Sequence, residues 1–297
     1  MEKTSIQTNE PLHVFWSEDY VLESDVETRR KSGPLAALLK SGEVANVKLV
    51  EPTPITRTEL LTIHEPQYID KLTTKDENLA RSIFASTGGV RDAVDAMFKF
   101  GKSGSLSSGL HHAKPDTEYG LCYLNGLALA ALRAISVHGV GNIGVLDLDA
   151  HCGGGTFTML GDNPNVTLAD VSCNSFDSWL PNSNRHFLEV ISDGREYLNA
   201  VKRSLAHLTN VDALIYNAGM DPFEDDGMGG MSGITREVLA ERERLVAQWC
   251  EDHQKPAMFV LAGGYCGSKL DIDGLVRMHL LTIKEFARIR INTARTD

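Results

Sequence analysis

The chain has 297 residues, of which 42% are hydrophobic and 23% charged, and its formal net charge is −11. These proportions are typical of a folded globular protein and exclude a fibrous or largely disordered chain. A duplex attracts a positive field, so the negative charge disfavours nucleic acid as the main partner and mildly favours cationic ligands. We expect no direct binding of nucleic acid.

The polar opening segment, MEKTSIQTNEPLHVFW, lacks the apolar stretch of a signal peptide, and no run of about 18 apolar residues occurs in the chain. We therefore expect a soluble, cytoplasmic protein with no membrane partner. The five cysteines are odd in number and show no C-x-x-C spacing. This pattern fits a reducing compartment and indicates neither a disulfide framework nor a thiolate zinc site.

The predicted elements alternate along the chain. In order, they are a helix over 88–101, a helix over 124–138, an apolar strand over 143–148, a helix over 193–208, a strand over 212–216, a helix over 235–253, a strand over 257–262 and a helix over 273–290. Continuous apolar runs are typical of strands buried on both faces of a parallel sheet. Alternating strands and helices predict an α/β fold, with a mainly parallel sheet between helical layers. No repeat or linker divides the chain, so we expect one domain over 1–297.

Chemically active side chains follow the first predicted strand. Asp147, Asp149 and His151 alternate in LDLDAHCGGG, and a period of two would aim all three toward the same side. Ligands of open α/β sheets bind beyond the carboxyl ends of the strands. Carboxylate and imidazole groups suit zinc, whose catalytic sites use three protein ligands and one open position. Asp221, in NAGMDP after the second strand, is the expected third ligand beside Asp149 and His151.

Two adjacent histidines, His111 and His112, lie in SSGLHHAKPD. One imidazole can accept a proton from water while a second, oriented by a buried carboxylate such as Asp147, stabilises a developing oxyanion. Tyr265 follows the third strand and can polarise a substrate carbonyl. Each residue taken alone also fits a packing or capping role, and only the combination favours a site. The glycines 153–155 do not indicate a phosphate loop, because the Lys and Ser/Thr that complete such a loop are missing.

Four segments together resemble the histone deacetylases and their bacterial relatives, the acetylpolyamine and acetoin-utilisation amidohydrolases. The double-histidine segment is GLHHAKPDTEYGLCYLNGLALA (109–130), the metal segments are LDLDAHCGGGT (146–156) and NAGMDPFEDDGMGG (217–230), and the glycine-tyrosine segment is LAGGYCG (261–267). The likeness extends over roughly 13–280 and implies the arginase-deacetylase fold.

The resemblance implies a zinc-dependent deacetylase, an amidohydrolase that removes an acetyl or other acyl group from acetyl-lysine or from an acylated small amine. It implies one zinc ion per chain. In this reading His112 is the general base and His111 is the electrostatic partner of Asp147. Tyr265 would donate a hydrogen bond to the tetrahedral oxyanion.

The resemblance also assigns roles around the reacting centre. Gly120 and Leu121 would line the substrate tunnel. Asp147 and Ser172 would help to hold a structural potassium ion. Asp226 would brace the loop that carries the third metal ligand.

This sequence departs from the family pattern in its tunnel and beside its base. Position 154 is Gly, where the family has an acid or amide bonded to the second histidine. We therefore expect His112 to lose its usual anchor and to be less basic, and we expect a water or another acid to substitute for that anchor. Leu121 replaces a Phe that forms one tunnel wall. The opposite wall is expected at Trp179 or Leu180.

Two other functions remain open from the sequence. A binuclear manganese ureohydrolase would need an acid after the Asp-Ala-His-Cys segment 149–152, where Gly153 cannot bridge a second metal. A catalytically weak acyl-amine-binding or scaffolding module is suggested by Gly154 and Leu121. The presence of all three ligands, both histidines and Tyr265 argues against that module.

Overall fold

The computed structural model describes residues 10–22 and 27–292; the expected domain's remaining segments, 1–9, 23–26 and 293–297, lie outside this part. The strands are β1 (Leu12–Phe15), β2 (Val47–Val50), β3 (Lys102–Ser105), β4 (Ile143–Asp147), β5 (Val166–Ser172), β6 (His186–Val190), β7 (Ala213–Asn217) and β8 (Ala257–Val260). The helices are α1 (Glu27–Arg30), α2 (Ser32–Lys40), α3 (Arg57–Leu60), α4 (Pro66–Lys75), α5 (Glu77–Phe100), α6 (Gly126–Ser136), α7 (Gly154–Leu160), α8 (Tyr197–His207), α9 (Arg236–Asp252) and α10 (Ile272–Arg288), with short 3-10 helices η1 (Glu18–Val21) and η2 (Gly194–Glu196).

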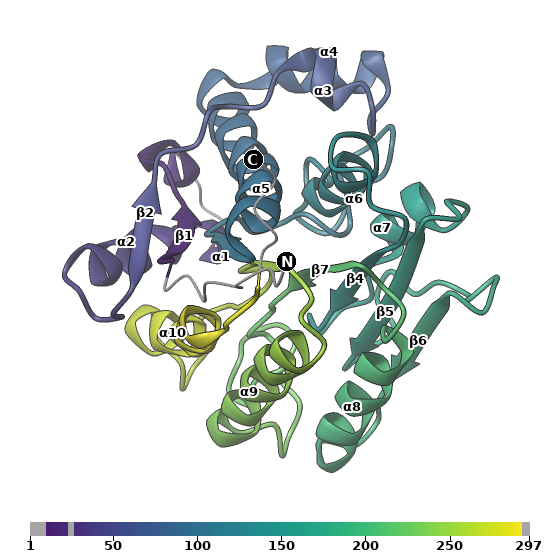
Figure 1. Ribbon diagram of the computed structural model, residues 1–297. Helices are drawn as coiled ribbons and strands as arrows, with labels where there is room; N and C mark the ends of the chain where they lie inside the picture. The colour runs from purple at the N-terminus through teal and green to yellow at the C-terminus, as the bar shows by residue number, and fades with distance from the viewer. Residues whose placement is uncertain (1–9, 23–26, 293–297) are drawn as a thin grey trace, which may run out of the picture.

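Within the described residues, eight strands form one sheet in the order β2-β1-β3-β8-β7-β4-β5-β6. Every pairing is parallel, so all carboxyl ends lie at one edge of the sheet. Figure 1 shows this sheet passing between two groups of helices. The predicted α/β fold with a parallel sheet between helical layers is confirmed.

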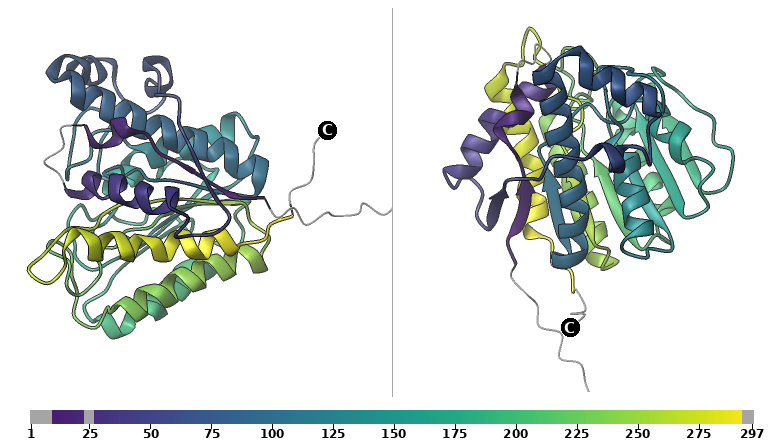
Figure 2. Two further views of the ribbon diagram at one scale, coloured as in Figure 1. Left: turned by 90° about the vertical axis from the view of Figure 1, so that its left-hand side faces the viewer. Right: turned by 90° about the horizontal axis from the view of Figure 1, so that it is seen from above.

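Helices cover both faces of the sheet, as the views in Figure 2 also show. One hydrophobic core joins the sheet to α2, α8, α9 and α10, and the other joins it to α3, α4, α5, α6 and α7. Neighbouring residues of β4 face opposite ways: Leu146 lies in the first core and Val145 in the second. Because successive side chains of a strand alternate between faces, a strand buried on both sides has no solvent-facing positions, which favours a continuous apolar run such as that of β4.

The structure corrects one helix boundary. The helix predicted over 88–101 begins earlier, at Glu77, because the Asp76 side chain caps it by accepting a hydrogen bond from the backbone N–H of Leu79. Gly88 and Gly89 lie inside this helix, where an added Cβ would collide with neighbouring chain. These glycines therefore allow close packing and do not begin the helix. No helix among 10–22 and 27–292 has the length and apolarity needed to cross a bilayer.

Candidate metal centre and active site

The predicted site residues gather at the carboxyl edge of four strands that are consecutive in the sheet, β3, β8, β7 and β4. Loops that follow parallel strands open into the same crevice, so residues far apart in sequence converge there. The loop after β3 carries His111 and His112, the loop after β4 carries Asp149 and His151, and the loops after β7 and β8 carry Asp221 and Tyr265.

Three potential metal ligands converge at this edge. The donor atoms of Asp149, His151 and Asp221 all lie within 4.8 Å of one another. His151 Nδ1 is 3.1 Å from Asp149 Oδ1 and 3.0 Å from Asp221 Oδ2. Burial alone would lower the pKa of His151, but its two carboxylate neighbours raise it to about 11. Two buried carboxylates facing one imidazole nitrogen call for a cation, and this oxygen and nitrogen donor set fits Zn²⁺.

The strand's alternation does not explain this convergence. β4 ends at Asp147, so the expected period of two does not continue to His151, and Asp147 points to another partner. Backbone N–H groups orient the ligands instead. Ala150 N donates to Asp221 Oδ1 at 3.0 Å and Gly263 N donates to Asp149 Oδ2 at 2.7 Å.

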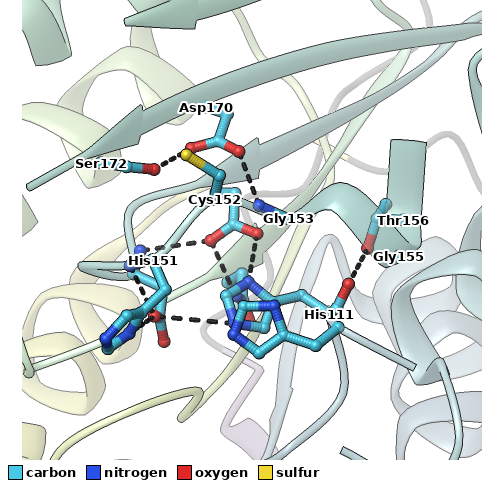
Figure 3. A network of polar contacts seen from close by, with 12 residues as sticks. His111, His151, Cys152, Gly153, Gly155, Thr156, Asp170 and Ser172 are labelled. Atoms are coloured by element: carbon cyan, nitrogen blue, oxygen red, sulfur yellow. Dashed lines mark hydrogen bonds and ion pairs between the residues drawn. The ribbon is translucent and has the colours of Figure 1, made fainter. Parts of the chain in front are cut away.

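His111 is held in a charged state by acidic neighbours. Its Nδ1 lies 2.9 Å from Asp147 Oδ2, and its Nε2 lies 3.6 Å from Asp149 Oδ1. Asn217 Nδ2 donates to the other oxygen of Asp147 at 2.8 Å. Burial would lower the pKa of His111, but Asp147 and Asp149 raise it to about 10. Asp149 Oδ1 is thus a neighbour of both His111 Nε2 and His151 Nδ1. Figure 3 shows these two histidines and the dashed contacts around them.

His112 lacks an anchor at position 154, as expected, and another acid takes its place. Its Nδ1 lies 2.9 Å from Asp177 Oδ2, in the loop after β5. Lys114 Nζ donates to the second oxygen of Asp177 at 2.6 Å. An added Cβ at Gly154 would collide with the backbone oxygen and the carboxylate of Asp177, so the relocated acid fills the space of a side chain at 154.

The two adjacent histidines differ in basicity. Their ring centroids are 3.9 Å apart. Burial, followed by the positive charge of His111, lowers the pKa of His112 to about 4, although Asp177 acts in the opposite direction. When two neighbouring groups have their pKa values driven apart, one is suited to act as a base and the other to remain charged.

Exposed aromatic and aliphatic side chains lie near His112. Gly120 has φ +52°, and an added Cβ there would collide with the His112 ring. Leu121, with φ +63°, exposes 46% of its surface. Phe176 meets His112 edge-on, with ring centroids 5.1 Å apart, and Tyr119 stacks on Phe176 at 5.2 Å.

The prediction that Trp179 or Leu180 forms the second wall is wrong. Trp179 is buried, and its Nε1 donates to Asp170 Oδ2 at 3.0 Å. Leu180 is 84% exposed. Phe176, which also meets His151 edge-on at 5.8 Å, occupies the place beside the ligands.

Tyr265 is held from its backbone by Asp226, as the expected bracing role requires. Tyr265 N donates to Asp226 Oδ2 at 2.6 Å, while Met228 N and Gly229 N donate to Asp226 Oδ1 at 2.9 and 3.1 Å. Burial, followed by the charge of Asp221, raises the pKa of Tyr265. The phenol therefore keeps its proton and remains a donor.

A buried lysine, Lys31, holds the backbone of the loop after β8, which carries Tyr265. Lys31 Nζ donates to Ala262 O at 2.7 Å and to Gly263 O at 2.9 Å. Lys31 thus connects the start of the chain with the segment that leads to Tyr265.

A second buried acid, Asp170, lies beside the residues expected to hold potassium. Asp170 is the parallel partner of Asp147 in β4 and β5. Ser172 Oγ donates to Asp170 Oδ1 at 2.5 Å, and Gly153 N donates to Asp170 Oδ2 at 2.8 Å (Figure 3). Burial and the charge of Asp147 raise the pKa of Asp170 to about 7. The Ser172 hydroxyl therefore bonds to Asp170. The binding of a potassium ion by Asp147 and Ser172 remains a prediction.

Sequence reasoning missed three side chains of this network: Asp170, Asp177 and Asn217. Asn217 and Asp170 carried a usable signal, since both lie within or at the end of an apolar strand where a polar residue is unusual. Asp177 carried none, because its partner His112 lies 65 residues earlier.

Comparisons with known proteins agree with this geometry. A family model described as the histone deacetylase domain matches residues 25–273. An uncharacterised protein of Picosynechococcus is 29% identical over 264 residues, which cover 82% of this chain and 86% of that protein. Histone deacetylase 2 of Arabidopsis thaliana is 23% identical over 259 residues, covering 78% and 67%.

Solved structures share the fold. The HDA15 HD domain superposes with a TM-score of 0.78 at 18% identity, covering 94% of this chain and 90% of that one. The acetylpolyamine aminohydrolase of Burkholderia pseudomallei superposes with a TM-score of 0.76 at 17% identity, covering 94% and 99%. Since the family model spans most of the sequence, this chain belongs to the histone deacetylase domain family.

Proposed function

We propose that this chain is a zinc-dependent amidohydrolase that removes an acetyl or other acyl group from acetyl-lysine or from an acylated small amine. One observation carries the proposal: the Asp149, His151 and Asp221 donors converge at the sheet edge beside two histidines whose pKa values are shifted in opposite directions. Membership of a deacetylase family supports amide hydrolysis as the reaction class.

Each residue has a definite task in this proposal. When bound, zinc supplies Lewis acidity, which makes water more acidic and polarises the acyl carbonyl. His112 Nε2 accepts the proton of the attacking water, while the bond from Nδ1 to Asp177 holds the ring. His111, kept protonated by Asp147, stabilises negative charge near the reacting carbon. The Tyr265 phenol donates a hydrogen bond to the oxyanion.

The exposed apolar side chains near His112 favour a substrate with a slender apolar stem. Tyr119 and Phe176 are each 42% exposed and Leu121 is 46% exposed, so apolar surface is open to solvent near His112. Gly120 lies directly against the His112 ring, where any side chain would collide with the ring. The methylene chain that links an acylated nitrogen to the rest of an amine can pack on these exposed apolar side chains, and the amide is then presented to the metal ligands.

The direct test is turnover of an acetylated fluorogenic lysine and of a panel of acylated amines by the purified protein. Activity should vanish when a chelator removes the metal, and it should return when one equivalent of zinc per chain is added. Two metal ions per chain would favour a binuclear ureohydrolase. Tight binding of acyl amines by zinc-loaded protein without turnover would favour a binding module and contradict the proposal.

A further inference from the structure

A fully buried ion pair lies behind the metal-ligand loops. Arg242 and Glu243 of α9 both have side chains with 0% exposure. Arg242 Nε donates to Glu243 Oε1 at 2.7 Å, and Tyr216 OH donates to the same oxygen at 2.9 Å. A buried ion pair is commonly no more stabilising than apolar residues of the same volume. A contribution to folding stability therefore does not by itself explain why this ion pair is present.

The rest of the guanidinium connects two strand ends. Arg242 Nη1 donates to Gly219 O at 2.7 Å and to Leu148 O at 3.3 Å. Leu148 directly precedes Asp149, and Gly219 lies just before Asp221. β4 and β7 are neighbours in the sheet, so one planar cation spans the two backbones that lead to the carboxylate ligands.

The ligands are sensitive to the spacing of these backbones. Ala150 N, in the loop after β4, donates to Asp221 Oδ1 across the gap, so movement of either loop displaces a ligand oxygen. We propose that Arg242 is a positioning residue for the metal centre: by holding the carbonyls of Leu148 and Gly219, it sets the separation of Asp149 and Asp221. This inference rests on the proposed function, because it takes these carboxylates to be metal ligands.

The chemistry of the side chain explains why arginine suits this place. A guanidinium presents several N–H groups in a rigid plane and keeps its charge when buried, so it can bind two carbonyls and a carboxylate together. An ammonium is a point donor that cannot reproduce this geometry. Partners beyond the ligands themselves typically change metal affinity by about 10- to 100-fold when they are altered.

The test measures zinc affinity of apoprotein by competition with a chelator of known affinity, together with its thermal unfolding. Arg242→Lys keeps the charge but loses the fork, and Arg242→Met combined with Glu243→Gln removes both charges and fills the space. We expect each variant to weaken zinc binding by about 10- to 100-fold. Tyr197→Phe is the matched control, because it removes the 3.0 Å bond between Tyr197 OH and Arg242 Nη1 without touching the carbonyl contacts.

The control should bind zinc like the wild type even where its unfolding temperature falls. Unchanged zinc affinity in either Arg242 variant would overturn the inference. It would also be overturned if Tyr197→Phe lost as much affinity as Arg242→Lys, since affinity would then follow stability. No substrate enters this measurement, so a protein that binds zinc but hydrolyses no acyl amine would contradict the proposed function and leave the inference intact.

Discussion

Replacing Asp177 by asparagine removes the charge that holds His112 while keeping the shape of the side chain. The carboxylate contacts His112 Nδ1 at 2.9 Å, and Lys114 Nζ donates to it at 2.6 Å. A hydrogen bond to a charged group is worth about 1.5–3 kcal/mol, and in the proposed mechanism His112 carries the transferred proton in the transition state. Losing that stabilisation should lower the turnover number about 10- to 100-fold.

The assay is steady-state hydrolysis of an acetylated lysine substrate, with zinc content measured on the same samples. KM and zinc content should remain near the wild-type values, because Asp177 is not a metal ligand in our assignment. Lys114→Met is the control, since it removes the second partner of Asp177 and leaves the bond to His112, and its loss should be smaller. Normal turnover in folded, zinc-loaded Asp177→Asn would refute the reasoning. Adding Gly154→Asp should not restore activity, because that position has no room for a side chain.

Three further predictions follow from the site and its support. Asp149→Ala should abolish stoichiometric zinc, measured by elemental analysis, and retained zinc would remove this ligand. Tyr265→Phe should lower turnover by about 100-fold or more at unchanged zinc content, whereas near-normal turnover would leave Tyr265 a packing residue. His64 accepts the N–H of Asn125 at Nε2, and burial lowers its pKa from 6.5 to about 4. Its neutral form is favoured in the folded state, so stability is full above pH 6.5 and falls by up to roughly 3 kcal/mol as the pH drops through 4. Urea unfolding at several pH values should show a weaker pH dependence in His64→Gln, and an identical dependence would contradict the assignment.

Three strands of the sheet were predicted from the sequence, each from a continuous apolar run. The runs at 143–148, 212–216 and 257–262 correspond to β4, β7 and β8. β3 was missed because its sequence is KSGS, which has no hydrophobic signal. Its serines are buried with their polar groups satisfied inside the protein; Ser103 Oγ, for example, donates to Ala93 O. Hydrophobic patterning cannot recognise a strand that is buried in this way.

The candidate site was predictable to the extent that its residues lie in short motifs. The ligand and histidine segments each identify their own residues, and the fold brings them together at one edge. The identity of the acid that anchors His112 could not be predicted in this way, because the side chain expected at 154 is replaced by Asp177 on a separate loop. The prediction that Trp179 lies beside the site was wrong for a related reason. Its indole N–H donates to the buried Asp170, and Phe176 packs against His112 instead.

The bonds from Lys31 to the loop after β8 have a consequence for synthesis of the chain. Lys31 and Ala262 are 231 residues apart in sequence, and Gly263 is 114 residues beyond the Asp149 that it holds. At about 5–20 residues per second, a ribosome needs roughly 6 to 23 seconds to add that last stretch. Until β8 and the loop after it emerge, a nascent chain has both histidines and all three predicted metal ligands, but it lacks Gly263, which holds Asp149, and it lacks Tyr265. The hydrolytic activity that we propose should therefore arise only after the loop that follows β8 has been made, and chains truncated before Gly263 should be inert.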